Sequence, residues 1–154
     1  DVELVIIGKP SEGGSSTDVI DELGLADCVS WVHGVSDDRI VELYSEAQIA
    51  VVPSLYEGFS LPAIEAMSCG VPLVTTTGGA LPEVAGPHDE TCFQVPPGDS
   101  EALASMIGKV LDSPESRARV GENGRQRVIE NWSWHHTALR TVEQYQLLLA
   151  ESQN

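Results

Sequence analysis

IAVVPSLYEGFSLPAIEAMSCGVPLVTT, residues 49–76, contains two short apolar runs separated by a segment with helical spacing. The runs IAVVP and PLVTT are apolar almost throughout, which is typical of strands buried on both faces of a parallel sheet. Between them, Gly58 permits a sharp bend, Ser60 is placed to cap a helix, and Pro62 fits a first helical turn. The stretch therefore predicts a strand, a turn, a helix that starts near Leu61 and a second strand.

The same alternation extends over the rest of the chain. Further apolar runs, which we interpret as buried strands, lie at residues 3–7, 28–32 and 91–95. Helical patterns are found at residues 17–25, at 37–47 behind the N-cap candidate Ser36, and over 100–112, 115–131 and 133–150. Alternating strands and helices predict an α/β fold, a Rossmann-like doubly wound parallel sheet followed by C-terminal helices. We expect a single domain over residues 1–154, because no linker divides the sequence.

The composition is that of a globular chain with a strongly acidic balance. Hydrophobic residues make up 42% and charged residues 21%, and no apolar run approaches the ~20 residues that a membrane span requires. The formal net charge of −16 disfavours nucleic acid and direct binding to anionic membranes as partners. Three cysteines without CxxC spacing imply neither a disulfide framework nor a zinc site, which fits a cytoplasmic setting.

Two acidic residues surround the expected helix start. Ligands of open parallel sheets bind at the carboxyl ends of the strands, and the free N–H groups of a helix start form an anion site there. Glu65, one turn into the helix, can accept two hydrogen bonds from a vicinal diol, and Glu57 can do likewise for a second ring. These residues predict a nucleotide- or sugar-binding domain. The alternative is that Glu57 is a loop charge and Glu65 a solvated helix residue.

Other groups that could have a chemical role give weaker signals. The Gly/Ser-rich loop GKPSEGGSS, residues 8–16, has neither dinucleotide-fingerprint nor P-loop spacing, and its Lys9 is either a phosphate-binding cation or simply solvated. The four histidines lack metal-ligand spacing, so no metal site is expected. We interpret Cys69 as a packed residue at a helix end, and the three tryptophans as packing residues rather than a platform for sugar stacking.

The longest motif of the chain is VVPSLYEGFSLPAIEAMSCGVPLVTTTGGALPEVAG, residues 51–86. It resembles, nearly position by position, the E-G-F-x-L-P-x-x-E-A-M-x-x-G-x-P-V-V and G-G-x-x-E pattern of the C-terminal domain of GT-B retaining glycosyltransferases. This group is often called glycosyltransferase family 4. The strand before Gly8, the V-x-x-x-G element that ends at Gly34, and the NWSW segment also fit, so the resemblance covers essentially the whole chain.

The resemblance implies a donor site for a nucleoside-diphosphate sugar. Its residues in this chain would be Glu57, Gly58, Phe59, Ser60, Leu61, Glu65, Gly34 and Val35. Glu57, the catalytic candidate, would bind hydroxyls of the donor sugar, and Glu65 would bind the ribose diol. Backbone N–H groups of residues 58–61 would meet the diphosphate and the sugar, and the loop at residues 34–35 would lie beside the base.

The reaction that the resemblance implies is the transfer of a hexosyl group to a glycan, lipid or small-molecule acceptor with retention at the anomeric carbon. No metal ion or other cofactor is expected, so fixed dipoles and cations must stabilise the leaving diphosphate. The family supplies an Arg and a Lys from a G-R-x(4)-K segment, whereas the only Gly-Arg pair here, Gly124-Arg125, lies in the terminal helical region. We therefore expect a fragment, inactive alone, that lacks a first strand-helix unit and an N-terminal acceptor domain.

Two alternatives remain open at this stage. One is a non-catalytic sugar-nucleotide-binding module, and the other is a non-hydrolysing sugar-nucleotide 2-epimerase; both would share the fold. The motif EGF-x-L-P-x-x-E-A-M argues against the epimerase. The expected partners are the nucleotide-sugar donor and the acceptor domain. The full-length protein is expected in the cytoplasm, free or peripheral at the membrane, in polysaccharide biosynthesis.

Overall fold

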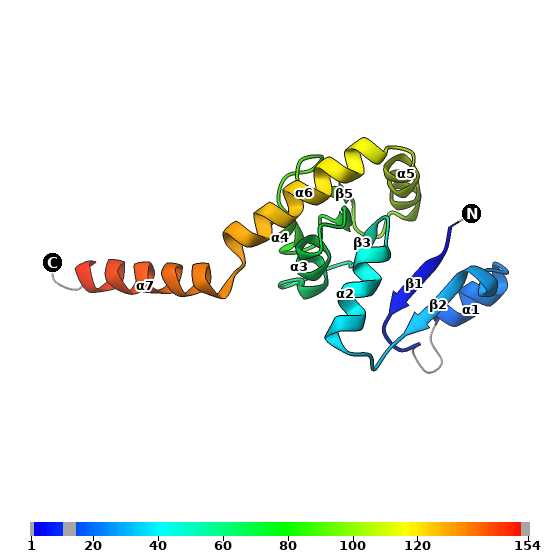
Figure 1. Ribbon diagram of the computed structural model, residues 1–154, viewed down its shortest axis with the longest axis horizontal. Coiled ribbons are helices and arrows are strands. Elements are labelled where there is room, and N and C mark those ends of the chain that lie inside the picture. Colours follow the sequence, from blue (N-terminus) through cyan, green and yellow to red (C-terminus); the bar gives the residue numbers. More distant parts are fainter. Residues whose placement is uncertain (1, 11–14, 152–154) are drawn as a thin grey trace. The chain divides into compact units, whose positions relative to one another are not determined.

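The computed structural model describes residues 2–10 and 15–151, and the chain divides into two compact units, residues 1–40 and 41–154, which are considered separately. The elements shown in Figure 1 are β1 (Leu4–Ile7), α1 (Ser15–Glu22), a 3-10 turn (Ala26–Cys28), β2 (Val29–Val32), α2 (Asp37–Glu46), β3 (Ala50–Val52), α3 (Leu61–Ser68), β4 (Leu73–Thr76), α4 (Leu81–Ala85), β5 (Phe93–Val95), α5 (Ser100–Leu111), α6 (Pro114–Asn131) and α7 (Trp134–Glu151). All predicted strands and helices are confirmed. The five-residue helix α4 and the 3-10 turn were not predicted.

The first unit contains the parallel pair β1 and β2, in which Leu4 lies opposite Val29 and Ile7 opposite Val32. The prediction that the first apolar run is buried is wrong, because Leu4 and Ile7 are 47% and 43% exposed. In the part of this unit that the structure describes, β1 pairs with β2 alone, so one edge of the strand has no hydrogen-bonded neighbour. Residues 11–14 of the Gly/Ser-rich loop lie outside the described residues.

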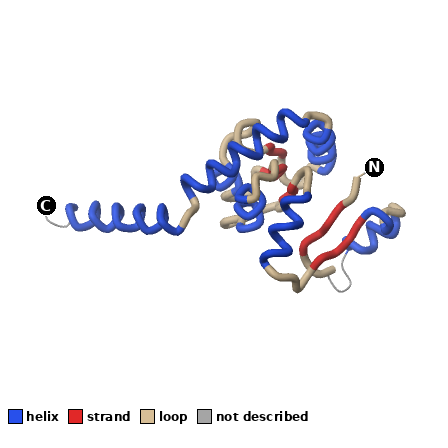
Figure 2. Tube along the Cα trace, viewed as in Figure 1, coloured by secondary structure: helices blue, strands red, loops and turns tan. Residues whose placement is uncertain are grey.

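The second unit is built on a three-stranded parallel sheet with the order β3-β4-β5. Ala50 of β3 lies opposite Leu73 of β4, and Val74 of β4 lies opposite Phe93 of β5. Figure 2 shows these strands in red with blue helices around them. The predicted Rossmann-like α/β fold with parallel strands is confirmed, although the five strands form two hydrogen-bonded sheets.

Neighbouring residues of β4 enter different parts of the core, because successive side chains of a strand point to opposite faces. Leu73 belongs to a cluster with residues of α3, α4 and α6, among them Met67, Val84 and Val128. Val74 belongs to a second cluster that includes residues of β5, α5 and α6. Helices therefore cover both faces of β4, as the uninterrupted apolar strand predicts.

Two glycines allow α6 to approach the rest of the second unit closely. A Cβ atom on Gly121 would lie 2.2 Å from the carbonyl oxygen of Gly70, and one on Gly124 would lie 2.9 Å from that of Thr91. Both distances are too short for any residue with a side chain. Gly124 is thus a packing residue of α6, and Arg125 donates to the carbonyl oxygen of Ser68 at the end of α3.

The last helix, α7, has no buried residue. Trp134 at its start is 90% exposed, so the packing role predicted for this tryptophan is wrong. Trp132, just before it, is half-buried and packs against the core, as predicted. None of the helices in the described ranges is both long and apolar enough to cross a membrane.

Candidate functional site

The segment from β3 to α3 places the predicted site residues at the carboxyl end of a strand. Ser60 occupies the N-cap position of α3 and its carbonyl accepts the Ile64 N–H, while Pro62 lies in the first turn, as predicted. The hydroxyl of Ser60 makes no capping hydrogen bond, so that part of the prediction is wrong. Instead, Ser60 Oγ is buried without a hydrogen-bond partner in the described structure. The first-turn N–H groups of Leu61 and Ala63 therefore lack a side-chain cap.

Glu57 is fixed by its side chain and by its backbone. The Ser54 hydroxyl donates to Glu57 Oε1 over 2.8 Å, and the Ala80 N–H donates to the Glu57 carbonyl oxygen, also over 2.8 Å. Glu57 also forms an isolated parallel bridge with Gly79. The half-buried carboxylate is thus held in the loop after β3 by a side-chain hydrogen bond and by backbone contacts.

The Gly78-Gly79 pair makes this approach possible. A Cβ atom on Gly78 would lie 2.4 Å from the Leu55 carbonyl oxygen, and one on Gly79 would lie 2.2 Å from that of Glu57. Gly79 also has a φ of 62°, which residues with a side chain rarely adopt. The Gly78-Gly79 pair therefore has a structural role, because its glycines let the backbone before α4 support the backbone of Glu57.

Glu65 lies one turn into α3 and is exposed. Tyr44 of α2 is its neighbour, and the Tyr44 hydroxyl donates to the Pro62 carbonyl oxygen over 3.4 Å. Burial, together with the negative charge of Glu65, raises the pKa of Tyr44 to about 12. Cys69 follows α3 as its C-cap, and burial raises the pKa of its thiol, so it is a packed helix-end residue as predicted.

Several apolar side chains are exposed around the two acids. Leu55 and Tyr56, which precede Glu57, are 70% and 76% exposed, and Phe59 and Leu61, which follow it, are 48% and 60% exposed. Apolar side chains gathered in this way on a surface typically mark a site for a ligand or a partner. This group of exposed apolar side chains was not predicted, although the segment SLYEGFSL contains all four of them.

The predicted donor residues divide between the two units. Glu57, Glu65 and residues 58–61 all belong to the second unit, where one strand-turn-helix segment brings them together. Gly34 and Val35 belong to the first unit and are exposed in the loop after β2. Gly34 has a φ of 66°, as expected for a glycine at a sharp turn. Their predicted place beside a base stays a prediction.

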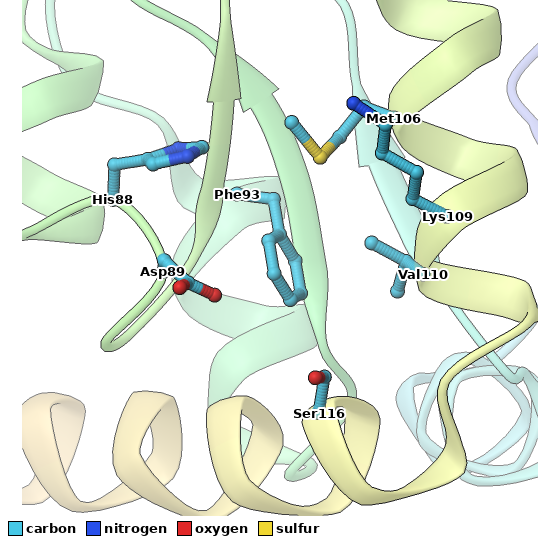
Figure 3. A pocket seen from close by; sticks show the side chains of 7 residues that line it. All are labelled: His88, Asp89, Phe93, Met106, Lys109, Val110 and Ser116. Carbon is cyan, nitrogen blue, oxygen red and sulfur yellow. The ribbon is translucent and has the colours of Figure 1, made fainter.

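A pocket of about 290 Å³ lies elsewhere in the second unit. Figure 3 shows the side chains of its lining, which are His88, Asp89, Phe93, Met106, Lys109, Val110 and Ser116. Because Phe93 opens β5, the pocket lies toward the amino end of this strand, whereas the predicted residues follow carboxyl ends. Two of its polar groups have structural partners: His88 Nδ1 accepts the Gln94 N–H over 2.9 Å, and Asp89 pairs with Arg119.

Among the described residues, no group of three or more His, Cys, Asp or Glu side chains is arranged to hold a metal ion. The helix start, its N–H groups and the two carboxylates offer instead hydrogen bonds to anionic oxygens and to hydroxyl groups. That combination suits a ligand with a phosphate and at least one diol.

The sequence did not reveal three residues that shape this site. Ser54 binds the Glu57 carboxylate, and its position three residues before the acid was the available signal. Arg127 and Trp132, from the second half of the chain, donate to backbone carbonyl groups of α4. No local pattern reveals the latter contacts, because they join residues 43 and 48 positions apart.

Comparison with known proteins identifies the family of this chain. Residues 1–127 match the family model described as "Glycosyl transferases group 1". The MMP alpha-(1->4)-mannosyltransferase of Mycolicibacterium hassiacum is 45% identical over 150 residues, which are 97% of this chain and 36% of that protein. The chain thus spans about a third of this relative's length.

Solved structures share the fold. Sucrose-phosphate synthase from Thermosynechococcus elongatus superposes with a TM-score of 0.84 at 35% identity, over 97% of this chain and 39% of that one. HepE of Anabaena, solved in complex with UDP-glucose, has a TM-score of 0.83 at 22% identity over 94% of this chain and 41% of that one. At that identity the likeness shows the fold alone.

Proposed function

The chain belongs to the group 1 glycosyl transferases, whose C-terminal domains it matches in sequence and fold, and from this premise we propose that it is the donor-binding part of a retaining hexosyltransferase. The donor is a nucleoside-diphosphate sugar, and the enzyme falls in the group called glycosyltransferase family 4. The acceptor is a glycan, a lipid or a small molecule that another part of the full-length protein binds in the cytoplasm.

One observation supports this proposal most strongly. A half-buried carboxylate, fixed by Ser54 and by the turn at Gly79, stands before a helix whose first-turn N–H groups lack a side-chain cap. A fixed carboxylate orients a sugar by its hydroxyl groups, and free N–H groups at a helix start attract a diphosphate. Both features occur within the seven residues 57–63.

The proposed roles follow from this arrangement. Glu57 binds hydroxyls of the transferred hexose and is the catalytic candidate, while Glu65 binds the ribose diol. The backbone at residues 58–61 binds the diphosphate and stabilises the negative charge that grows on it as the glycosidic bond breaks. Residues 34–35 of the first unit lie beside the base. No metal ion or other cofactor is required.

The cations that complete the diphosphate site come from another part of the protein in this proposal. The described residues around the start of α3 supply N–H dipoles, and the only lysines of the chain are Lys9, which is exposed in the first unit, and Lys109 of α5. Two observations support a larger enzyme. The chain spans about a third of the length of the mannosyltransferase that it matches, and strand β1 is exposed. The isolated chain is accordingly inactive and binds donor weakly.

The experiment is a transfer assay of the full-length protein against a panel of nucleoside-diphosphate hexoses, with the anomeric configuration of the product read by NMR. We expect one donor to be consumed with retention of configuration. Glu57→Ala should lower kcat by at least about a hundredfold, because a group that acts in the transition state is lost. An inverted product, or full turnover by Glu57→Ala, would refute the proposal.

A further inference from the structure

Arg127, near the end of α6, and Trp132, just after α6, contact the last carbonyl groups of α4. Arg127 Nε donates to the Val84 carbonyl oxygen over 3.0 Å, and the same guanidinium donates to that of Glu83. The indole N–H of Trp132 also donates to the Val84 carbonyl oxygen, over 3.2 Å. Two long side chains therefore converge on one end of a helix.

These donors matter because α4 is only five residues long. A helix of this length is not stable by itself, and its last carbonyl groups have no partners within the helix. Gly86, which ends α4, leaves room for the guanidinium, since a Cβ atom there would lie 2.7 Å from Arg127 Nε. The placement of α4 thus depends on Arg127 and Trp132 in addition to its buried residues Leu81 and Val84.

The other end of α4 supports Glu57. Ala80, the N-cap of α4, donates its N–H to the Glu57 carbonyl oxygen, and Gly79 beside it forms the bridge with Glu57. Gly79 also touches the Glu57 backbone so closely that no side chain fits between them. A shift of α4 would therefore move the backbone of Glu57.

Trp132 reaches the same segment by a second route. Its ring lies edge-on to that of Phe59, with the ring centroids 5.3 Å apart and the planes at 75°. Edge-to-face aromatic pairs of this kind are favourable beyond the area that they bury. One side chain thus contacts both the helix that supports Glu57 and the residue two positions after Glu57.

We propose that Arg127 and Trp132 are positioning residues of the donor site: they hold α4 and Phe59, and through these they fix Glu57 and the backbone at residues 57–59 where the donor sugar binds. This inference rests on the proposed function for the identity of the ligand. The nucleoside diphosphate shares the backbone at residues 58 and 59 with the sugar, but it also contacts residues 60, 61 and Glu65, so it depends on this support less than the sugar does.

The experiment uses the full-length protein with the variants Arg127→Met and Trp132→Phe, the second of which retains a ring beside Phe59 and loses the N–H donor. Arg119→Met is the matched control, since Arg119 also lies on α6 and donates to a backbone carbonyl group, that of Asp89. Three quantities are measured: amide hydrogen exchange at residues 56–60 and 78–81, kcat/KM for the nucleotide sugar, and the dissociation constant of the nucleoside diphosphate.

We expect Arg127→Met and Trp132→Phe to raise exchange in both segments and to lower kcat/KM about tenfold, because a small displacement of a site residue has a large effect on turnover. Nucleoside diphosphate binding should weaken by no more than about threefold, since its contacts at residues 60, 61 and 65 are retained. Arg119→Met should leave all three quantities within about twofold, because its contact lies at the other end of α6.

Unchanged exchange at residues 56–60 in both variants would overturn the inference. So would equal fold losses in kcat/KM for the nucleotide sugar and in affinity for the nucleoside diphosphate, which would indicate a general structural effect. If the wild-type protein consumes no nucleotide sugar, the proposed function fails, and the exchange rates alone then decide whether Arg127 and Trp132 position the segment.

Discussion

At the scale of single residues, the two acids of the site are held very differently. Glu57 is half-buried, bound by Ser54 and supported through its backbone, whereas Glu65 is exposed on α3. A fixed carboxylate is suited to the reacting sugar, where small errors of position slow the reaction. The exposed carboxylate is suited to a ribose diol at the periphery of the site.

Gly79 gives the first prediction. Gly79→Ala places a methyl group against the Glu57 carbonyl oxygen at a φ of 62°, so we expect a loss of stability of about 1–3 kcal/mol and at least about a tenfold loss of kcat/KM. Gly108→Ala is the control. Gly108 lies in α5 with open space at its Cβ position, so this change should stabilise the protein by about 0.5–1 kcal/mol. Thermal unfolding and steady-state kinetics of both variants measure these effects, and full activity of Gly79→Ala would contradict the role of this turn.

Cys92 gives a prediction about pH. Burial raises the pKa of its thiol from 9.0 to about 11, so between these values the folded state retains a proton that the unfolded state has lost. The free energy of unfolding should therefore fall as the pH rises from 9 toward 11, by up to about 2–3 kcal/mol from this residue.

The measurement is urea unfolding of the wild type and Cys92→Ala at pH 8 and at pH 10.5. The variant is less stable at pH 8 because it leaves a cavity, but it should lose less stability between the two pH values. An identical loss in both proteins would show that the thiol is not protected from ionisation in the fold.

At the scale of elements, the sequence predicted the helices and strands well because their signals are local. The runs IAVVP and PLVTT contain β3 and β4, and the helix starts predicted after Ser36 and near Leu61 fall where α2 and α3 begin. Besides the 3-10 turn, two features were not predicted. The helix α4 is short and stabilised by contacts from α6, and the exposure of β1 depends on its neighbours in the sheet, which periodicity does not reveal.

The two N-caps provide a prediction at this scale. Asp99 caps α5 by accepting the Ala102 N–H over 2.8 Å, so Asp99→Ala should destabilise the protein by about 1 kcal/mol. Ser60 makes no such bond, and its hydroxyl is buried without a partner among the described residues. Ser60→Ala should therefore leave stability unchanged or raise it by up to about 1 kcal/mol, because an unsatisfied buried group is removed. Chemical unfolding measures both, and a clear loss in Ser60→Ala would reveal a hydrogen bond of this hydroxyl in solution.

At the scale of the whole molecule, the sequence indicated most of the candidate site because one continuous segment contains it. Residues 57–65 follow a strand and open a helix, and that placement can be derived from Gly58, Ser60 and Pro62 alone. The supporting residues could not be derived in this way. Arg127 lies near the end of α6 and Trp132 just after it, and both reach α4 because Gly121 and Gly124 let α6 pack closely against Gly70 and Thr91.

The central claim is that the carboxylates and the start of α3 bind a nucleoside-diphosphate sugar. Its most direct test is calorimetric titration of the full-length protein, and of its Glu65→Ala variant, with the nucleotide sugar that the wild type turns over. We predict that the variant binds this donor at least about tenfold more weakly, with a free energy of unfolding within about 0.5 kcal/mol of the wild type. Equal affinity of the two proteins for the donor would contradict the account.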